Sequence, residues 1–377
     1  MTQYIYIFLL VLVFMILLSI YVYKIMDRIL WALMKKRRRW RTVILTLIIM
    51  IPSVNVFSLW AAVVLHIIAI AALIDLIQLI VTKRLGKLER PKVWNIMYTF
   101  CVIPIVLTGM ILSYGYYNMH HIVESDYNIT TTKELREGGY KIVFLSDLHF
   151  GTTMNSRQLQ MNCNKIKKVS PDLVILGGDI VDENTSKEKM QKAFQTIAKL
   201  HPSLGIYYVY GNHDKNLYSR NPNYTEDELQ ETIEKYQIRI LDDSSWKISN
   251  EISITGRNDT WVAQMEQKKR TSSKELAKNT QKNNYHILVD HQPRDMDENE
   301  EAGFELMLSG HTHAGQLWPV GLLTVLFDNQ TVNYGIRQFN KMNLVVSSGI
   351  GGWGYPLRTG KHSEFVVINL TSELNKY

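Results

Sequence analysis

The sequence predicts an α/β fold class, in which a layered α/β domain follows an all-α transmembrane region. Two observations support this prediction. Long apolar runs dominate residues 1–117, and a run of about 20 apolar residues is long enough to cross a bilayer. From residue 140 onward, short runs rich in Val, Ile and Tyr alternate with segments of helical character, which is typical of strands and helices packed in layers. The length of 377 residues allows for both parts.

Four helices are expected in the first part. Residues 4–23 are a run of 20 residues without a charge, and the stretch 42–81 is interrupted only by His66 and Asp75. Turn-prone residues around Pro52 mark the place where a hairpin would reverse. An ionisable residue within a span is costly, so we expect Asp75 to be paired or to reach the interface. The expected helices cover roughly 4–23, 42–57, 58–81 and 93–117.

Positive charge in this part is concentrated in two segments. All 13 of its Lys and Arg residues lie within 24–41 and 83–92, whereas 52–58 contains none. The positive-inside rule places both basic segments in the cytoplasm. Four crossings then put the N-terminus and the globular domain on the other side. The sequence therefore predicts a multi-pass protein of the cell membrane with an extracytoplasmic globular domain.

The globular part is slightly acidic. It holds 29 of the 42 Lys and Arg residues and 32 of the 35 Asp and Glu residues. A protein that binds nucleic acid needs a basic surface on its globular part, so this balance excludes nucleic acid as a partner. The two cysteines, Cys101 and Cys163, provide no disulfide framework.

Residues 118–139 are expected to form an extended connector, 140–370 the α/β domain and 371–377 a tail. Thr225 opens one predicted helix with Glu228 three residues later, which is a capping box. The predicted helices are 156–169, 186–200 and 225–236. The predicted strands, rich in β-branched and aromatic residues, are 141–145, 172–176, 206–210, 285–289, 304–308, 343–347 and 365–368.

Polar residues directly follow the first five of these strands. Open α/β sheets place their sites at the carboxyl ends of strands, so we expect these residues to share one rim. In the Asp-x-His and His-x-His pairs, alternation along an extended chain points both side chains to the same side. The residues concerned are Asp147 with His149, Asp179 with Asp182, Asn212 with His213 and Asp214, Asp290 with His291, and His311 with His313.

These residue types suit a site for two metal ions. Carboxylates and imidazoles are suitable ligands for Zn, Fe and Mn. A bridging carboxylate and a bridging hydroxide can hold two cations about 3.5–4 Å apart, which is the geometry for in-line attack on phosphorus. The pattern thus predicts a dinuclear site that hydrolyses a phosphate ester or a pyrophosphate.

The order of the motifs resembles the signature of the calcineurin-like metallophosphoesterases. The resemblance covers about residues 140–370 and is nearest to a membrane-associated bacterial branch, on the basis of segments 309–316 and 347–358. It implies a four-layer α/β/β/α sandwich and a metal-dependent phosphoric ester hydrolase, either a phosphatase or a phosphodiesterase. The matching motifs are Asp147-x-His149, Gly178-Asp179, Gly211-Asn212-His213-Asp214, His291 and Gly310-His311-Thr312-His313.

The resemblance also implies a role for each residue. His213 would contact the phosphate and protonate or stabilise the leaving oxygen, oriented by Asp182 or Asp214. Protein Ser/Thr phosphatases have Arg where this chain has Glu183, which argues against a protein phosphatase. Two divalent cations, Mn, Fe or Zn, would be bound, one by Asp147, His149 and His313, the other by Asn212, His291 and His311, with Asp179 as the bridge.

The substrate is open to several interpretations. Residues 317–327 are apolar but interrupted by Pro and Gly, so they either cover the site as a buried segment or form a lip for a lipid tail or the bilayer. Trp353 and Tyr355 either flank the same opening or pack in the core. The leading hypothesis is a lipid-linked phosphoester. The alternatives are a soluble or cell-wall phosphodiester, with the membrane part only an anchor, and a non-catalytic receptor or scaffold stabilised by metal. The sequence does not define the oligomeric state.

Overall fold

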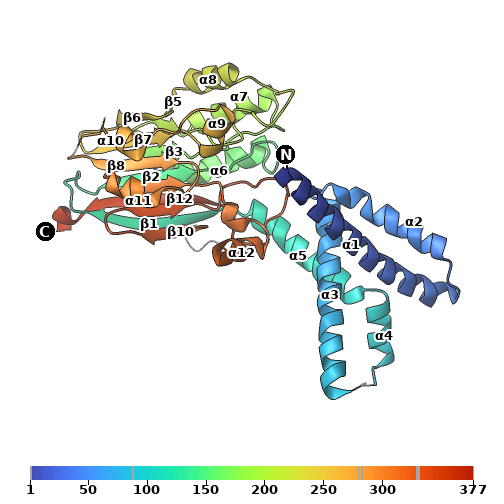
Figure 1. Cartoon of the computed structure of the whole chain (residues 1–377). Coiled ribbons are helices and arrows are strands. Elements are labelled where there is room, and N and C mark those ends of the chain that lie inside the picture. The colour runs from blue at the N-terminus through green and yellow to red at the C-terminus, as the bar shows by residue number, and fades with distance from the viewer. Residues whose placement is uncertain (1, 87–88, 279, 282, 328–331, 377) are drawn as a thin grey trace. The chain divides into compact units, whose positions relative to one another are not determined.

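The computed structural model describes residues 2–86, 89–278, 280–281, 283–327 and 332–376 (Figure 1). The chain divides into two compact units, Met1–Tyr114 and Gly115–Tyr377. The boundary falls within helix α5, so the last turns of this helix belong to the second unit.

Helices make up the first unit. Three of the described helices are long and apolar enough to cross a membrane, over Leu9–Met34, Leu59–Leu85 and Val102–His120. The elements are α1 (Thr2–Met34), α2 (Arg39–Met50), the short 3₁₀ turn η1 (Pro52–Val54), α3 (Leu59–Leu85), α4 (Lys92–Thr99) and α5 (Val102–His120).

Two of the four predicted helices differ from the structure. The second, α2, has 12 residues and is about 18 Å long, which is too short to cross a hydrocarbon layer of about 30 Å by itself. The last is divided into α4 and α5 at Phe100 and Cys101, where Cys101 has a φ of 52°. Pro104 explains the break, because a proline ring clashes with the carbonyl four residues earlier in a continuous helix.

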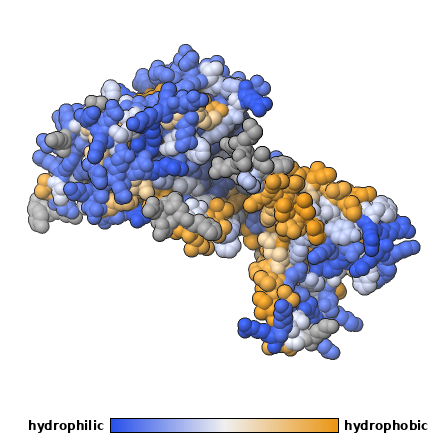
Figure 2. Space-filling model, viewed as in Figure 1, coloured by the Kyte–Doolittle hydropathy of each residue, from blue (hydrophilic) through white to orange (hydrophobic). Residues whose placement is uncertain are grey.

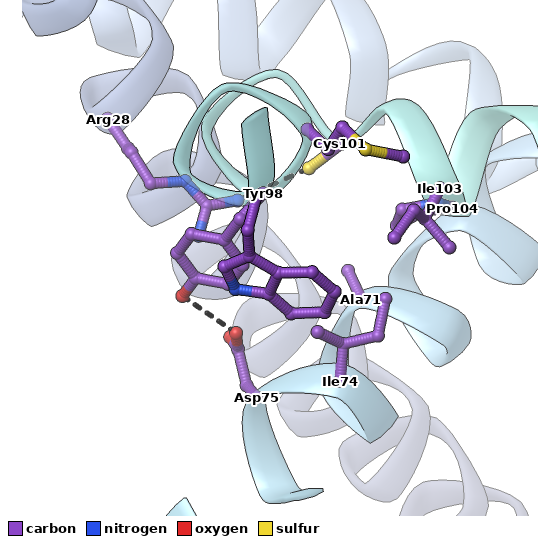
Figure 3. Close-up of a pocket in the computed structure, with 10 residues that line it drawn as sticks. Arg28, Ala71, Ile74, Asp75, Tyr98, Cys101, Ile103 and Pro104 are labelled. Carbon is purple, nitrogen blue, oxygen red and sulfur yellow. Dashed lines mark hydrogen bonds between the residues drawn. The ribbon is translucent and has the colours of Figure 1, made fainter. Parts of the chain in front are cut away.

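Helices α1 and α3 run in the same direction within the first unit. Val22 of α1 packs in a cluster with Val64 and Ile68, and Ile25, one turn later, packs with Ala71. The carboxylate of Asp75, one turn after Ala71, accepts hydrogen bonds from two tyrosines and is therefore paired. The donors are Tyr21 (2.7 Å) and Tyr98 (2.8 Å). Figure 3 shows the contact of Tyr98 with Asp75, together with Arg28, whose guanidinium lies 4.0 Å from the Tyr98 ring centroid.

Two six-stranded mixed sheets form the centre of the second unit (Figure 1). The first has the order β1-β12-β2-β3-β4-β5, and the second β10-β11-β9-β8-β7-β6. The first sheet contains β1 (Val123–Thr131), β2 (Tyr140–Leu145), β3 (Leu173–Leu176), β4 (Ile206–Tyr208), β5 (Ile238–Ile240) and β12 (Glu364–Ser372). The second contains β6 (Ser244–Lys247), β7 (Ile252–Arg257), β8 (Tyr285–Asp290), β9 (Leu306–Ser309), β10 (Gly335–Gln338) and β11 (Asn343–Val346).

Three apolar cores separate four layers, as the predicted α/β/β/α sandwich requires. Val143 packs against the helices on the outer face of the first sheet, whereas Ile142 packs between the sheets against Ile287, because neighbouring residues of a strand face opposite sides. A third core, including Leu288, lies beneath helices on the second sheet. The helices are α6 (Ser156–Val169), α7 (Lys187–Ala198), α8 (Glu226–Lys235), α9 (Thr260–Met265), α10 (Ser273–Ala277), α11 (Met296–Glu301) and α12 (Val320–Phe327), with 3₁₀ turns η2 (His313–Gly315) and η3 (Glu373–Lys376).

The predicted connector contains a strand. β1 pairs with β12 in parallel over nine residues at the edge of the first sheet. The charged residues Glu124 and Asp126 obscured it in the sequence, because an edge strand exposes alternate side chains. The predicted tail is also structured, since β12 continues to Ser372 and η3 follows it.

Candidate metal centre

Two groups of side chains could each hold a metal ion. Within each group, one ligand atom per residue lies within 4.8 Å of the others. The residues of the two groups follow β2, β3, β8 and β9, so the ends of these strands converge, and Asn212 follows β4. The first group is Asp147, His149 and His313, and the second is Asp179, His291 and His311.

Asp179 connects the two groups. Its Oδ2 lies 3.1 Å from Nε2 of His291 and 3.7 Å from Nε2 of His149, which belongs to the first group. Its Oδ1 accepts a hydrogen bond of 2.9 Å from the backbone N–H of His213, the residue after Asn212. The two groups therefore form one continuous site.

Several ligand atoms of these residues have lone pairs that no hydrogen-bond donor satisfies, and bound cations could satisfy them. His291 Nδ1 lies 2.7 Å from the carbonyl oxygen of Gly177 and donates to it, so Nε2, when it carries no proton, directs a lone pair toward the carboxylate of Asp179. Two acceptors that face each other require a cation or a proton between them. Several buried polar atoms in the described part of the chain have no hydrogen-bond partner, and three of them belong to the proposed ligands, namely His149 Nε2, His291 Nε2 and Asn212 Oδ1. Buried polar atoms normally have partners, and metal coordination would supply them.

The ionisation states also suit metal ligands. Burial, together with the charge of His291, lowers the pKa of His311 to about 4. Burial and His149 likewise hold the pKa of His313 well below its usual value. Although burial raises it, the pKa of Asp179 is held well below the ordinary range by His291 and His213. Neutral imidazoles and an ionised carboxylate are the forms that bind metals. Although burial lowers it, the pKa of His291 is raised well above its usual value by the carboxylate of Asp179, so His291 would release a proton on binding a metal.

Left-handed backbone is concentrated at this site. A residue other than glycine with positive φ is uncommon, and such conformations cluster at functional sites. Gly310 directly precedes one of these residues, His311, and has no space for a side chain, since a Cβ at Gly310 would lie 2.2 Å from Asp147 Oδ2. The φ values are 54° at Asp147, 43° at His149, 53° at Asp179, 68° at His311 and 48° at His313.

Residues 140–315 match the family model of the calcineurin-like phosphoesterases. They form a calcineurin-like phosphoesterase domain. A domain of this kind supports metal-dependent hydrolysis of phosphoesters, as the order of its motifs predicted.

Three relatives illustrate the range of similar proteins. An uncharacterized metallophosphoesterase of Aquifex aeolicus is 29% identical over 266 residues, covering 70% of this chain and 97% of the relative. A transmembrane protein with a metallophosphoesterase domain from Danio rerio is 28% identical over 284 residues, covering 71% and 62%. An uncharacterized metallophosphoesterase of Campylobacter jejuni is 31% identical over 237 residues, covering 61% and 59%. The match thus spans about three fifths of the latter two proteins.

In the phosphoesterase domain, His213 contacts a carboxylate that the sequence did not indicate. Both carboxylate oxygens of Glu183 lie 3.0 Å from His213 Nδ1. Burial lowers the pKa of His213, but Asp179 and Glu183 outweigh it and raise the pKa to about 9. The side chains of His213 and Glu183 are 14% and 20% exposed, so the pair lies at the mouth of the site.

Asp182 and Asp214, the predicted partners of His213, have other contacts. Asp182 Oδ2 lies 3.3 Å from His149 Nδ1, so it orients a candidate metal ligand. Asp214 accepts backbone hydrogen bonds that shape the two loops carrying Asp179 and Asn212. Its donors are Asp179 (2.7 Å), Ile180 (2.9 Å), Val181 (3.2 Å) and Gly211 (2.6 Å).

Replacing Glu183 with Gln is expected to slow hydrolysis about tenfold, because the variant keeps His213 as a proton donor but loses the carboxylate that orients it, and so loses part of the roughly 10²–10⁴-fold contribution of general acid catalysis. The loss should be greatest for esters with poor leaving groups, which need a proton from His213. Steady-state rates on alkyl and p-nitrophenyl esters, with the bound metal measured in parallel, check this expectation. Glu231→Gln, at an exposed position on α8, is the matched control. An equal loss on both esters would contradict the assignment.

Gln316 fixes an aromatic residue beside His213. Its Nε2 donates to the carbonyl oxygens of Trp353 (3.0 Å), Tyr355 (3.0 Å) and Leu357 (3.1 Å), and its Oε1 accepts from the Trp353 N–H. The Trp353 ring lies 5.5 Å from the His213 ring and is 37% exposed. Trp353 therefore flanks the opening.

Arg358 connects the site to the end of α5. Its guanidinium is fully buried and donates to the carbonyl oxygens of His313 (2.9 Å) and Gly351 (2.6 Å). Its backbone N–H donates to Gly115, and its carbonyl accepts from the Asn118 side chain (both 3.0 Å). No sequence motif could indicate this role, because the contacts depend on the folded loops.

Arg358→Met is expected to lower the free energy of unfolding of the phosphoesterase domain by about 2–4 kcal/mol, because two buried carbonyls would lose their donors. Thermal unfolding followed by near-UV circular dichroism measures the change. Arg157→Met on α6 removes an exposed guanidinium and should alter the stability little. Similar midpoints for the two variants would show that Arg358 does not support the site.

Proposed function

We propose that the domain hydrolyses phosphoesters at a site for two cations. The position of Asp179 between the two groups of side chains carries this proposal, because a shared carboxylate can keep two cations about 3.5–4 Å apart. When bound, the cations would activate a water molecule as hydroxide and neutralise the phosphoryl oxygens. One cation would be held by Asp147, His149 and His313 and the other by Asn212, His291 and His311, with Asp179 shared.

The chain supplies the proton for the leaving group. Glu183 accepts the hydrogen bond from His213 Nδ1, which leaves Nε2 to face the substrate. A protonated His213 would bind a phosphoryl oxygen and then protonate the leaving oxygen. Asp182 would keep His149 in the orientation that directs Nε2 toward the metal.

Metal analysis and kinetics of the purified full-length chain in nanodiscs test the proposal. We expect two metal equivalents per chain and hydrolysis of p-nitrophenyl phosphate or its diester with Mn²⁺, Fe²⁺ or Zn²⁺. The ratio of the two rates identifies a monoesterase or a diesterase. Protein that binds two metals but hydrolyses neither ester would instead be a metal-stabilised receptor or scaffold.

We further propose that the domain is anchored in the cell membrane by several spans and lies outside the cytoplasm. The contacts between α1 and α3 support this arrangement, because positive charge lies at the C-terminal end of both helices, at Lys35 after α1 and at Lys83 and Arg84 in the last turn of α3. After α1, the chain would cross back to the other side through α2, η1 and the residues up to Ser58, after which α3 begins. A cysteine introduced into the domain tests the orientation. We expect a membrane-impermeant reagent to label it in intact cells. Labelling only after lysis would mean that the domain lies in the cytoplasm.

The proposed substrate is a lipid-linked phosphoester. A cavity of about 610 Å³ begins at Ala314, the neighbour of His313, and is lined by both apolar and polar side chains. The apolar lining includes Trp318, Leu322 and Val325, whereas Lys361 offers a cation. A lipid tail beside a phosphate needs this combination.

Replacing Trp318 and Leu322 with Ser together should slow hydrolysis of a lipid-linked ester about tenfold more than hydrolysis of a soluble ester, because two apolar contacts to the tail are lost. Rates on both substrates are measured in the same nanodisc preparation. Ile336→Ser, at an exposed apolar residue of β10, is the control. Equal slowing on both substrates would favour a soluble or cell-wall phosphodiester.

A further inference from the structure

Helix α12 exposes apolar side chains on the phosphoesterase domain. Leu323 is 43% exposed and Leu326 is 67% exposed, and Trp318, just before the helix, is also 67% exposed. Figure 2 shows hydrophobic surface on this part of the globular unit. Contiguous apolar surface is rare on soluble domains and usually marks a contact with a partner or a membrane.

The exposed residues fall on two sides of α12. Leu322 and Val325 line the cavity described above, whereas Leu323 and Leu326 do not. Residues three apart lie on one face of a helix, so Leu323 and Leu326 form an outer face. The cavity therefore does not explain why the side chains of this outer face are apolar.

The start of α12 is attached to the end of a candidate membrane span. The Trp318 N–H donates to Thr359 Oγ1 at 3.0 Å, and the methyl group of Thr359 lies so close to Gly115 that a Cβ there would be 2.9 Å away. Gly115 belongs to α5, and the next residues, Tyr116 and Tyr117, are 58% and 60% exposed. Exposed aromatic residues at the end of a span are typical of the membrane interface.

From these contacts we infer that the outer face of α12 lies in the phospholipid leaflet from which α5 emerges. The helix is a second membrane contact that runs along the interface instead of crossing it. Leu323 and Leu326 enter the acyl region, and Trp318 occupies the interface. The exposed ammonium group of Lys361, in the segment next to Thr359, favours anionic headgroups. This contact does not depend on the proposed substrate.

Fluorescence quenching of the full-length chain in nanodiscs tests the inference. A Leu326→Cys variant is labelled with an environment-sensitive fluorophore, and quenching by nitroxide on the lipid chains is compared with quenching by aqueous iodide. Met161→Cys is the matched control, because Met161 is 54% exposed on α6. The two native cysteines are buried, and unmodified protein measures background labelling.

We expect the lipid nitroxide to quench the label at position 326 about three times as strongly as the label at position 161, or more. Iodide should quench the label at position 161 more strongly than the label at position 326. Equal behaviour of the two labels would overturn the inference. A label at 326 protected from both quenchers would also overturn it, because protein would then cover α12. None of these outcomes requires catalysis, so they are independent of the proposed function.

Discussion

Replacing Asp179 with Asn should lower kcat/KM for phosphoester hydrolysis by about three orders of magnitude. Asp179 Oδ2 faces His291 at 3.1 Å and His149 at 3.7 Å, so one carboxylate serves both groups of side chains. An amide has the same shape but lacks the negative charge that draws two cations together. Loss of one cation removes several kcal/mol of transition-state stabilisation, and each 1.4 kcal/mol corresponds to a factor of ten.

Metal content and rate should be measured on the same preparation. We expect the Asn variant to lose at least one metal equivalent while the domain remains folded, because Asn adopts positive φ more readily than most residues. Asp227→Asn, at an exposed position on α8, controls for the loss of a surface charge. A variant that retains two metals and the wild-type rate would refute the shared role of Asp179.

Replacing His213 with Gln should lower kcat by about 10²–10⁴-fold, the usual contribution of general acid catalysis. Unlike Asp179, His213 is not among the proposed metal ligands, so both cations should remain bound. The loss should depend on the leaving group. A p-nitrophenolate departs readily without a proton, whereas an alkoxide does not, so the alkyl ester should show the greater effect.

A comparison of His213→Gln with Glu183→Gln separates donation of the proton from orientation of the donor. The first variant should lose more activity than the second, and both should show the same leaving-group trend. His201→Gln, at an exposed histidine outside the site, is the control. Loss of bound metal in His213→Gln would mean that His213 is a ligand and not a proton donor.

The strand-end motifs could be predicted because their chemistry is local. Asp147 and His149 are two residues apart, as are His311 and His313, and each pair follows a buried strand that directs it to the common rim. The structure brings these pairs together in the two groups around Asp179. The packing of helices and sheets in layers could likewise be predicted. Neighbouring residues of a strand face opposite sides, so two consecutive apolar residues such as Ile142 and Val143 must pack into two different cores.

The contacts of Glu183 depend on geometry that spacing does not encode. The chain turns after Asp182, whose Oδ1 accepts the N–H of Asn184 at 2.9 Å while its Oδ2 faces His149. This turn takes Asp182 away from His213 and brings Glu183 to it. Hydropathy similarly identified the membrane region but not its break at Cys101, because the effect of Pro104 is steric and not apolar.

The left-handed backbone at five candidate ligands restricts how this protein could diversify. At such positions Asn, Asp and His are favoured and β-branched residues are strongly disfavoured, so few of the possible amino-acid exchanges leave the loop intact. Replacement of Asp147 or Asp179 by Asn or His would therefore keep the conformation of the loop, whatever its effect on the metal, whereas Thr or Val would strain it. Backbone conformation, as much as coordination chemistry, sets the evolutionary paths open to the site.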